Sequence, residues 1–371
     1  MYAQQSIQDL LFMMLYGGVA MLTLAAGIYL WLRRSNAIAA DVNPPKALRR
    51  WAAAFFFMAA LSHVWWYVLG IYWLTDDRLV RNITAVMLDH ITLVPLVMAL
   101  LLRLLQDSQR RIWPWFLAQA PIVVFGAMSI ASHDEYGFDL MRYWELALIV
   151  VFIIYYIRAL LRYGRWLREN YADLEHKEVW QSLLFMVTLC VIYEIYSNNP
   201  GNMGIEYLSQ VNTLIIIAFL LWRVETLQEL NAKETVMPEE VAEEIAEEAV
   251  EDNASSDNTQ WIAAQLEILC ESKKLFLQHD LTLQQLALAI GTNRTYLGAF
   301  FAQQGITYNT YINRLRIKHF MQLYRESITS SHPATAQQLA PKCGFRSYGT
   351  FSTAFKIHAG TTVYTWMREQ A

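Results

Sequence analysis

The sequence predicts an all-α protein built from two unlike halves. Residues 1–226 are expected to form a seven-helix transmembrane bundle, residues 227–260 an acidic linker, and residues 261–371 a soluble domain with two helix-turn-helix units. Three observations predict this division. They are a series of apolar runs about as long as a bilayer is thick, a run of glutamates after them, and two similar helix-turn-helix patterns near the end.

The apolar runs are each roughly 18 to 22 residues long, the length of helix that crosses about 30 Å of hydrocarbon. Seven such runs lie at residues 10–31, 51–73, 83–105, 112–131, 143–161, 179–196 and 205–222. The first run lacks a small-residue cleavage site, and further runs of similar length follow it. We therefore expect it to be a membrane span and not a removed signal peptide.

The loops between these runs alternate in positive charge. The first, third and fifth loops carry clusters of Lys and Arg, whereas the second, fourth and sixth are poorer in them. Lys and Arg concentrate in cytoplasmic loops. The pattern therefore predicts a multi-pass protein of the inner membrane, with its N-terminus outside and, after an odd number of crossings, its C-terminal domain in the cytoplasm.

The C-terminal region opens with "LTLQQLALAIG" at residues 281–291. Its apolar residues repeat at helical spacing, and Gly291 permits the tight turn of a helix-turn-helix unit. Thr292 or Asn293 can cap the helix that follows. A second copy, "TAQQLAPKCGFRSYGTFSTAFKIHAG", starts at Thr335, and a long helix with the sequence "YNTYINRLRIKHFMQLYRESI" is expected to join the two units.

Two helix-turn-helix units joined by a connecting helix resemble the DNA-binding domain of the AraC/XylS family of bacterial transcription regulators. The resemblance covers Trp261 to Ala371 and rests on "NRTYL", on "YINRLRI" and on the "CGFRS" track of the second unit. It implies that the second helix of each unit enters the major groove of double-stranded DNA. The candidate DNA-contacting residues are Asn293, Arg294, Thr295, Tyr296, Arg346, Ser347, Tyr348 and Thr350. For each of them the alternatives are a base contact, a phosphate contact and plain exposure to solvent.

Other positions of this domain give further expectations. Gly298 and Ala299 stand where the family often has Ser and Arg, and Thr353 stands at a matching arginine position. The missing arginines remove cations that could contact phosphates. Arg314 and Arg316 are expected to hold the connecting helix against its neighbours more than to touch DNA. Positive side chains outnumber negative ones from Trp261 onward, which suits an anionic partner.

The linker carries glutamate pairs that recur every four residues between Glu239 and Asn258. In a helix this spacing places like charges four residues apart, which disfavours an isolated helix. We expect a solvated, partly helical spacer that ends in a flexible hinge. In an alternative hypothesis, this polyanion occupies the basic face of the next domain and competes with DNA.

Polar side chains inside the apolar runs are the chemical groups of the N-terminal half, because they are costly there and normally face the bundle interior. They are His63, Asp89, His90, Glu145, Glu194 and Asn212. Four of them, His63, Asp89, His90 and Glu194, could converge on a small ligand or a metal. Hydrogen bonding between helices is the alternative.

No cofactor is predicted. Cys190, Cys270 and Cys343 are widely separated and lack metal-ligand spacing, so neither a zinc site nor a disulfide framework is indicated. Cys343 is expected in the core. The only lysines before the linker, Lys46 and Lys177, lie in loops, so the seven runs offer no Schiff base for retinal.

Two functions remain after the sequence is searched for enzyme motifs, of which none is found. The favoured one is a membrane-embedded one-component transcription regulator that binds promoter DNA under control of its transmembrane domain. A ligand or an envelope signal would act on that domain, and homodimerisation is the hypothesis for how the signal crosses. The alternative is a membrane receptor or scaffold whose helix-turn-helix domain binds protein instead of DNA.

Overall fold

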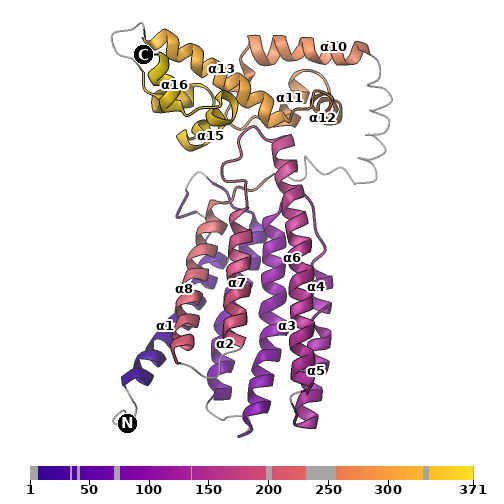
Figure 1. Ribbon diagram of the computed structural model, residues 1–371, viewed down its shortest axis with the longest axis vertical. Coiled ribbons are helices and arrows are strands. Elements are labelled where there is room, and N and C mark those ends of the chain that lie inside the picture. Colours follow the sequence, from indigo (N-terminus) through magenta and orange to yellow (C-terminus); the bar gives the residue numbers. More distant parts are fainter. Residues whose placement is uncertain are drawn as a thin grey trace. The chain divides into compact units, whose positions relative to one another are not determined.

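The computed structural model of the protein describes residues 7–33, 36–39, 42–70, 76–134, 136–197, 203–230, 256–328 and 334–370. Side chains are not described for residues 190–197 and 256–258. Every regular element in the described ranges is a helix, and their β pairing is one isolated bridge between Tyr171 and Thr282 (Figure 1). The predicted all-α fold is confirmed.

The chain divides into two compact units. Unit 1 comprises Met1–Leu161 and Val179–Leu230, and unit 2 comprises Arg162–Glu178 and Asn231–Ala371. Residues 162–178, expected from the sequence in the N-terminal domain, group in the structure with the C-terminal one. Packing explains the difference, because Ala172 belongs to the hydrophobic core of the first helix-turn-helix unit. Residues 231–255, most of the acidic linker, lie outside the described residues.

Unit 1 is a bundle of helices that are mostly long and apolar. It contains α1 Ile7–Leu32, α2 Lys46–Gly70, α3 Arg78–Leu104, α4 Trp113–Leu117, α5 Ala120–Ser132, most of α6 Tyr136–Asn170, α7 Gln181–Ser197 and α8 Met203–Thr226. Among the described residues, six stretches are long and apolar enough to cross a membrane, one fewer than predicted.

Two of the seven predicted spans differ in the structure. The missing one is α7, which coincides with the run at residues 179–196 but has only 17 residues, the lower limit for a span. The run at residues 112–131 is broken into α4 and α5, which together form the stretch Trp113–Ser132. The break precedes Pro121, whose ring nitrogen has no hydrogen to donate to a continuous helix.

Close packing in unit 1 depends on small residues. A Cβ added at Gly27 of α1 would lie 2.9 Å from Cε1 of Phe57 in α2, so the two helices approach where α1 has no side chain. On α2, Ala52, Ala53 and Phe56 are fully buried. Many large apolar side chains point outward instead, Met14 and Leu184 among them. Unit 1 therefore has an apolar exterior as well as an apolar core.

Unit 2 is made of shorter helices. It contains α10 Ser256–Gln265, η2 Leu266–Ser272, η3 Leu275–Leu277, α11 Leu283–Ala289, α12 Arg294–Gln303, α13 Tyr308–Ile328, α14 Ala336–Lys342, α15 Tyr348–Ala359 and α16 Val363–Gln370. Two helix pairs, α11 with α12 and α14 with α15, form the two predicted helix-turn-helix units. The long helix α13 connects them, as predicted.

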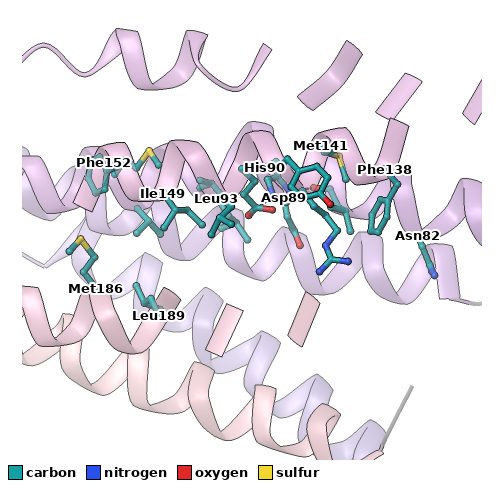
Figure 2. Close-up of a pocket in the computed structure, with 18 of the residues that line it drawn as sticks. Asn82, Asp89, His90, Leu93, Phe138, Met141, Ile149, Phe152, Met186 and Leu189 are labelled. Atoms are coloured by element: carbon teal, nitrogen blue, oxygen red, sulfur yellow. Dashed lines mark hydrogen bonds and ion pairs between the residues drawn. The ribbon is translucent and has the colours of Figure 1, made fainter. Parts of the chain in front are cut away.

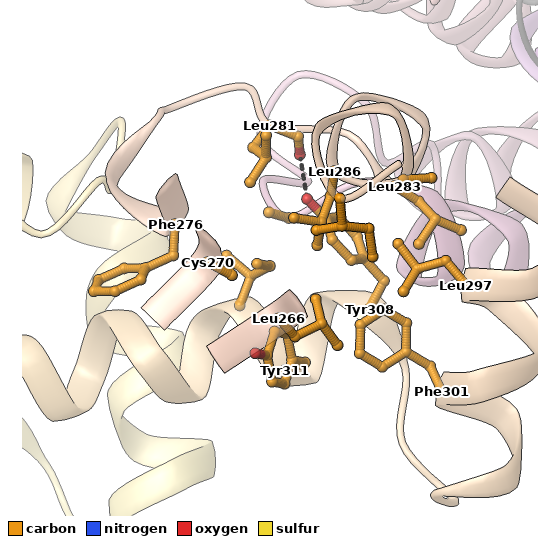
Figure 3. Close-up of a cluster of buried hydrophobic side chains, with 14 of the residues drawn as sticks. Leu266, Cys270, Phe276, Leu281, Leu283, Leu286, Leu297, Phe301, Tyr308 and Tyr311 are labelled. Atoms are coloured by element: carbon orange, nitrogen blue, oxygen red, sulfur yellow. Dashed lines mark hydrogen bonds between the residues drawn. The ribbon is translucent and has the colours of Figure 1, made fainter. Parts of the chain in front are cut away.

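The first helix-turn-helix unit closes around a core to which α10, η2, η3, α11, α12 and α13 contribute (Figure 3). Thr282 caps α11: its Oγ1 accepts a hydrogen bond from the Gln285 backbone nitrogen, and Oε1 of Gln285 accepts one from the Thr282 backbone nitrogen. Gly291 then takes a φ of 79°, a left-handed conformation that glycine adopts without steric cost. The core includes Leu286 and Leu297, and the Tyr308 hydroxyl donates a 3.0 Å hydrogen bond to the Leu281 carbonyl.

The second helix-turn-helix unit repeats this construction. Thr335 and Gln338 form the same reciprocal cap at the start of α14, and Gly344 takes a φ of 86° at the turn. Its core is aromatic, with the Phe320 ring of α13 centred 4.5 Å from the Phe351 ring of α15. Cys343 is fully buried in this core, as predicted.

Arg316 of α13 is the most buried cation of unit 2, with no exposed surface. Its Nε donates to the Phe276 carbonyl at 2.8 Å, and its Nη2 donates to the carbonyls of Gln278 and His279 at 2.7 and 3.2 Å. Arg316 thus fastens the connecting helix to the segment before the first helix-turn-helix unit. Arg314, two residues earlier, is exposed, so the predicted role belongs to Arg316 alone.

Candidate nucleic-acid interface and bundle cavity

The N-terminal turns of α12 and α15 carry the residues predicted to contact DNA. Asn293 is the N-cap of α12, and its Oδ1 accepts a hydrogen bond from the Tyr296 backbone nitrogen at 2.9 Å. Ser347 caps α15 in the same way, with its Oγ accepting from the Thr350 nitrogen at 3.3 Å. These two side chains fix where each helix begins, and the cap occupies one of the two lone pairs of the Asn293 Oδ1.

The other predicted residues differ in exposure. Tyr348 is 41% exposed, whereas Arg294, Thr295, Arg346 and Thr350 are half-buried. Tyr296 packs against the core of the first unit. The structure therefore places these residues at the starts of both second helices, where Asn293 and Tyr348 are exposed, the others are half-buried and Tyr296 also packs against the core.

Both arginines of the predicted set, Arg294 and Arg346, have acidic neighbours within unit 2. The Arg346 guanidinium lies 3.7 Å from Oδ2 of Asp280, the residue before the start of the first helix-turn-helix pattern. Burial lowers the pKa of Arg294, while Tyr171 and Glu169 oppose that shift electrostatically. Arg346 is therefore close to a carboxylate of the same chain, and Arg294 interacts electrostatically with another.

Thr353 illustrates the departures from the family pattern. Its hydroxyl donates a 3.0 Å hydrogen bond to the Gly349 carbonyl, one turn earlier in α15, so the side chain bonds within its own helix. Gly298 contributes no side chain beyond α12, where a Cβ would lie 3.8 Å from Cδ2 of Leu283. Neither position supplies a cation for a phosphate.

A family model for a helix-turn-helix domain of the AraC type matches residues 286–369. The match lies wholly in unit 2, covers less than a quarter of the chain, and contains both second helices. This is a family of DNA-binding domains and not of enzymes. No curated protein and no solved structure matches the chain.

Unit 1 contains a cavity of about 660 Å³ between α3 and α6, with a contribution from α7. Figure 2 shows that one part of it is polar, around Asn82, Asp89 and His90, while Phe152, Met186 and Leu189 line the other part. Arg78, Arg142 and Glu206 also line it. The cavity is therefore amphipathic along its length.

The polar residues of the cavity are held by bonds between helices. Nε2 of His90 lies 2.7 Å from Oε1 of Glu145, and both side chains are buried. The Asp89 carboxylate accepts hydrogen bonds from Ser62 at 2.6 Å and from the indoles of Trp65 and Trp66 at 3.1 and 2.7 Å. These bonds join α3 to α6 and to α2. Hydrogen bonding between helices is the alternative that the sequence offers for these residues.

The structure brings together only part of the predicted polar set. Asp89 and His90 line the cavity, but His63 does not: its Nε2 lies 3.3 Å from Gln210 of α8. The Glu194 side chain lies outside the described residues. Glu145 joins the site instead, although the sequence analysis counts it only as a polar span residue. Its helix position alone does not reveal a partner about 55 residues away along the chain.

A metal centre finds no support within the described residues. No group of three or more His, Cys, Asp or Glu side chains there could hold a metal ion. The paired His90 and Glu145 stand beside Asp89, but the carboxylate of Asp89 is directed to three donors of α2. The arrangement suits hydrogen bonding to a polar ligand group better than coordination.

Proposed function

We propose that the protein is a membrane-embedded one-component transcription regulator that binds promoter DNA through its two helix-turn-helix units. The observation that carries the proposal is the pairing of two such units, with residues 286–369 matching a DNA-binding family. The apolar exterior of unit 1, with six stretches of spanning length, supports residence in a lipid bilayer. The cation pattern of the loops supports an inner-membrane protein with a cytoplasmic C-terminal domain and an outside N-terminus.

The contacts to DNA are assigned to the surface at the starts of α12 and α15. Arg294 and Arg346 supply the cations, and Thr295, Tyr348 and Thr350 supply hydroxyl groups for phosphates and base edges. Asn293 and Ser347 position these groups by capping the helices. Tyr296 links the contact surface to the core.

A gel-shift experiment tests the DNA-binding proposal directly. The full-length protein, purified in lipid nanodiscs, is mixed with DNA from upstream of its own gene at two salt concentrations. If the protein makes two or more phosphate contacts, we expect its affinity to fall by ~tenfold or more when the salt concentration rises from about 50 to about 200 mM. The reason is that DNA binding releases counterions, and added salt opposes that release. Unrelated DNA of equal length and composition is the control for sequence discrimination.

A receptor or scaffold whose helix-turn-helix domain binds protein is the second candidate. The observation that favours it is that Ala299 and Thr353 stand where the family often has arginines that could contact phosphates. The same gel shift separates the two functions. Equal and salt-insensitive retention of both DNA fragments, or none at all, would favour the scaffold.

The cavity of unit 1 is the proposed input site. Its charged part and its apolar part suit an amphipathic ligand whose polar head meets Asp89, His90 and the arginines. A ligand bound there would contact α3 and α6 together, because the His90–Glu145 pair joins these helices. We further propose that the ligand changes the fraction of dimer, since pairing two DNA-binding domains raises the effective concentration of the second.

Filling the cavity tests its role. Ile149→Trp places a large side chain in the cavity lining, whereas Val150→Trp, one residue later, adds the same side chain on the exposed surface of α6. We expect a reporter gene behind the protein's own promoter to change its output about fivefold or more in the Ile149→Trp strain, because occupancy of an input site shifts the regulator between states. Equal output from both variants, at equal protein level, would remove the cavity from the proposal.

A further inference from the structure

Residues 162–178 form a segment of unit 2 that lies against the DNA-binding domain. Tyr171 pairs with Thr282, the N-cap of α11, in an antiparallel β bridge. The Asn309 amide of α13 donates to the carbonyls of Tyr171 and Ala172 at 3.2 and 2.7 Å. Backbone atoms of the segment are therefore bonded at two places on the domain.

The same segment enters the hydrophobic core. Ala172 is 1% exposed and belongs to the cluster that contains Leu283, Leu297 and Tyr308. Asp173, the next residue, is 2% exposed. The segment thus has a small apolar residue in the core and two backbone carbonyls bonded by the Asn309 side chain. Both are features of a specific docking site.

Charged side chains extend the contact to both candidate DNA-binding helices. The Thr350 hydroxyl of α15 donates to Oε2 of Glu175 at 3.1 Å. Asp280 lies 3.4 Å from Nζ of Lys177 and 3.7 Å from the Arg346 guanidinium. It therefore connects the segment to the second helix-turn-helix unit. Near α12, Glu169 and Tyr171 interact electrostatically with Arg294.

Three of the residues proposed to touch DNA therefore already have partners in or beside this segment. Its carboxylates lie near the starts of α12 and α15, where a phosphate would also be favoured by the helix dipole. We infer that residues 162–178 are an internal competitor of DNA, and that the domain must release them before both units can enter the major groove. This inference rests on the proposed DNA-binding function.

A disulfide across the β bridge tests the inference. Opposed residues of an antiparallel pair have Cα atoms about 4.5–5.5 Å apart, within the range that a disulfide spans. The full-length double variant Tyr171→Cys/Thr282→Cys is compared with itself before and after reduction, so that the effects of the substitutions cancel. We expect the oxidised protein to bind its promoter DNA at least about tenfold more weakly than the reduced protein.

Each outcome of this comparison decides something. If the disulfide forms and DNA affinity is the same in both states, the segment does not compete, although the regulator function stands. If the cysteines do not cross-link under oxidation, the docked segment is wrong. If neither state binds DNA while the unmodified protein also fails to bind, the proposed function itself is refuted, and the inference with it.

A second variant approaches the same question from the opposite direction. Asn309→Ala removes both hydrogen bonds to the segment without altering any residue assigned to DNA. We expect it to tighten DNA binding by roughly threefold to tenfold, which is the effect of losing about 1 kcal/mol from the closed form. Gln322→Ala, an exposed change on the same helix, is the matched control and should leave the affinity unchanged. Unaltered or weaker binding in Asn309→Ala would contradict competition.

Discussion

Replacing Arg316 by methionine is expected to destabilise the helix-turn-helix domain by roughly 3–5 kcal/mol, the cost of breaking a buried polar arrangement from one side. Methionine replaces the aliphatic stem but leaves the carbonyls of Phe276, Gln278 and His279 without their donor. It also removes the guanidinium that lies 5.5 Å from the Phe345 ring centre.

Cysteine labelling measures this loss in the full-length protein. Cys343 has no exposed surface, and burial raises the pKa of its thiol to about 12, so the folded domain protects it from thiol reagents. Labelling of the Cys343 peptide, followed by mass spectrometry over a urea series, therefore reports domain opening. Arg314→Met, an exposed change on the same helix, should stay within about 0.5 kcal/mol of the parent. Identical urea profiles for the two variants would show that the buried hydrogen bonds contribute little.

Removing both arginines at the starts of α12 and α15 is expected to weaken DNA binding by roughly 100-fold, or about 2.7 kcal/mol. Arg294→Ala and Arg346→Ala each delete one cation from the proposed contact surface. Both residues also interact with carboxylates of unit 2, so part of the loss is offset by a weaker closed form. The net effect remains a loss, because the closely spaced phosphates of DNA present a denser array of negative charge than one or two carboxylates of the protein.

A variant with equal net charge separates contact from overall charge. Arg314→Ala/Arg368→Ala also removes two cations from exposed positions of unit 2, α13 and α16. We expect it to lower the affinity less than about threefold and to keep most of the salt dependence. A loss as large as that of the first pair would mean that DNA binding follows the net charge of the domain and not the surface at the helix starts.

The sequence predicted well what depends on neighbouring residues. The two helix-turn-helix units follow from apolar spacing, from glycines with positive φ and from Thr and Asn caps, and all of these act within one or two turns. Span lengths were predicted within several residues at most ends. The exception is α6, which runs from Tyr136 to Asn170 and so extends well beyond both ends of the predicted run at residues 143–161; helix ends are determined by contacts as well as by hydropathy.

The candidate sites were predicted less completely, because they combine residues from distant segments. His90 and Asp89 were found from their cost inside an apolar run, but His63 separates from them and Glu145 takes its place beside His90. Arg314 and Arg316 have the same chemistry and lie two residues apart. A difference of about 200° around the helix decides which of them is buried.

By itself, therefore, the sequence determined the helices, their caps and turns, the apolar stretches and the chemical groups at the starts of α12 and α15, since local spacing and hydrophobicity control all of these. Only the tertiary structure decided that Arg316 is enclosed, that His90 pairs with Glu145, and that residues 162–178 dock on the DNA-binding domain. Each of these depends on groups more than 35 residues apart in the chain. Their meeting is set by the packing of whole helices, which no short stretch of sequence specifies.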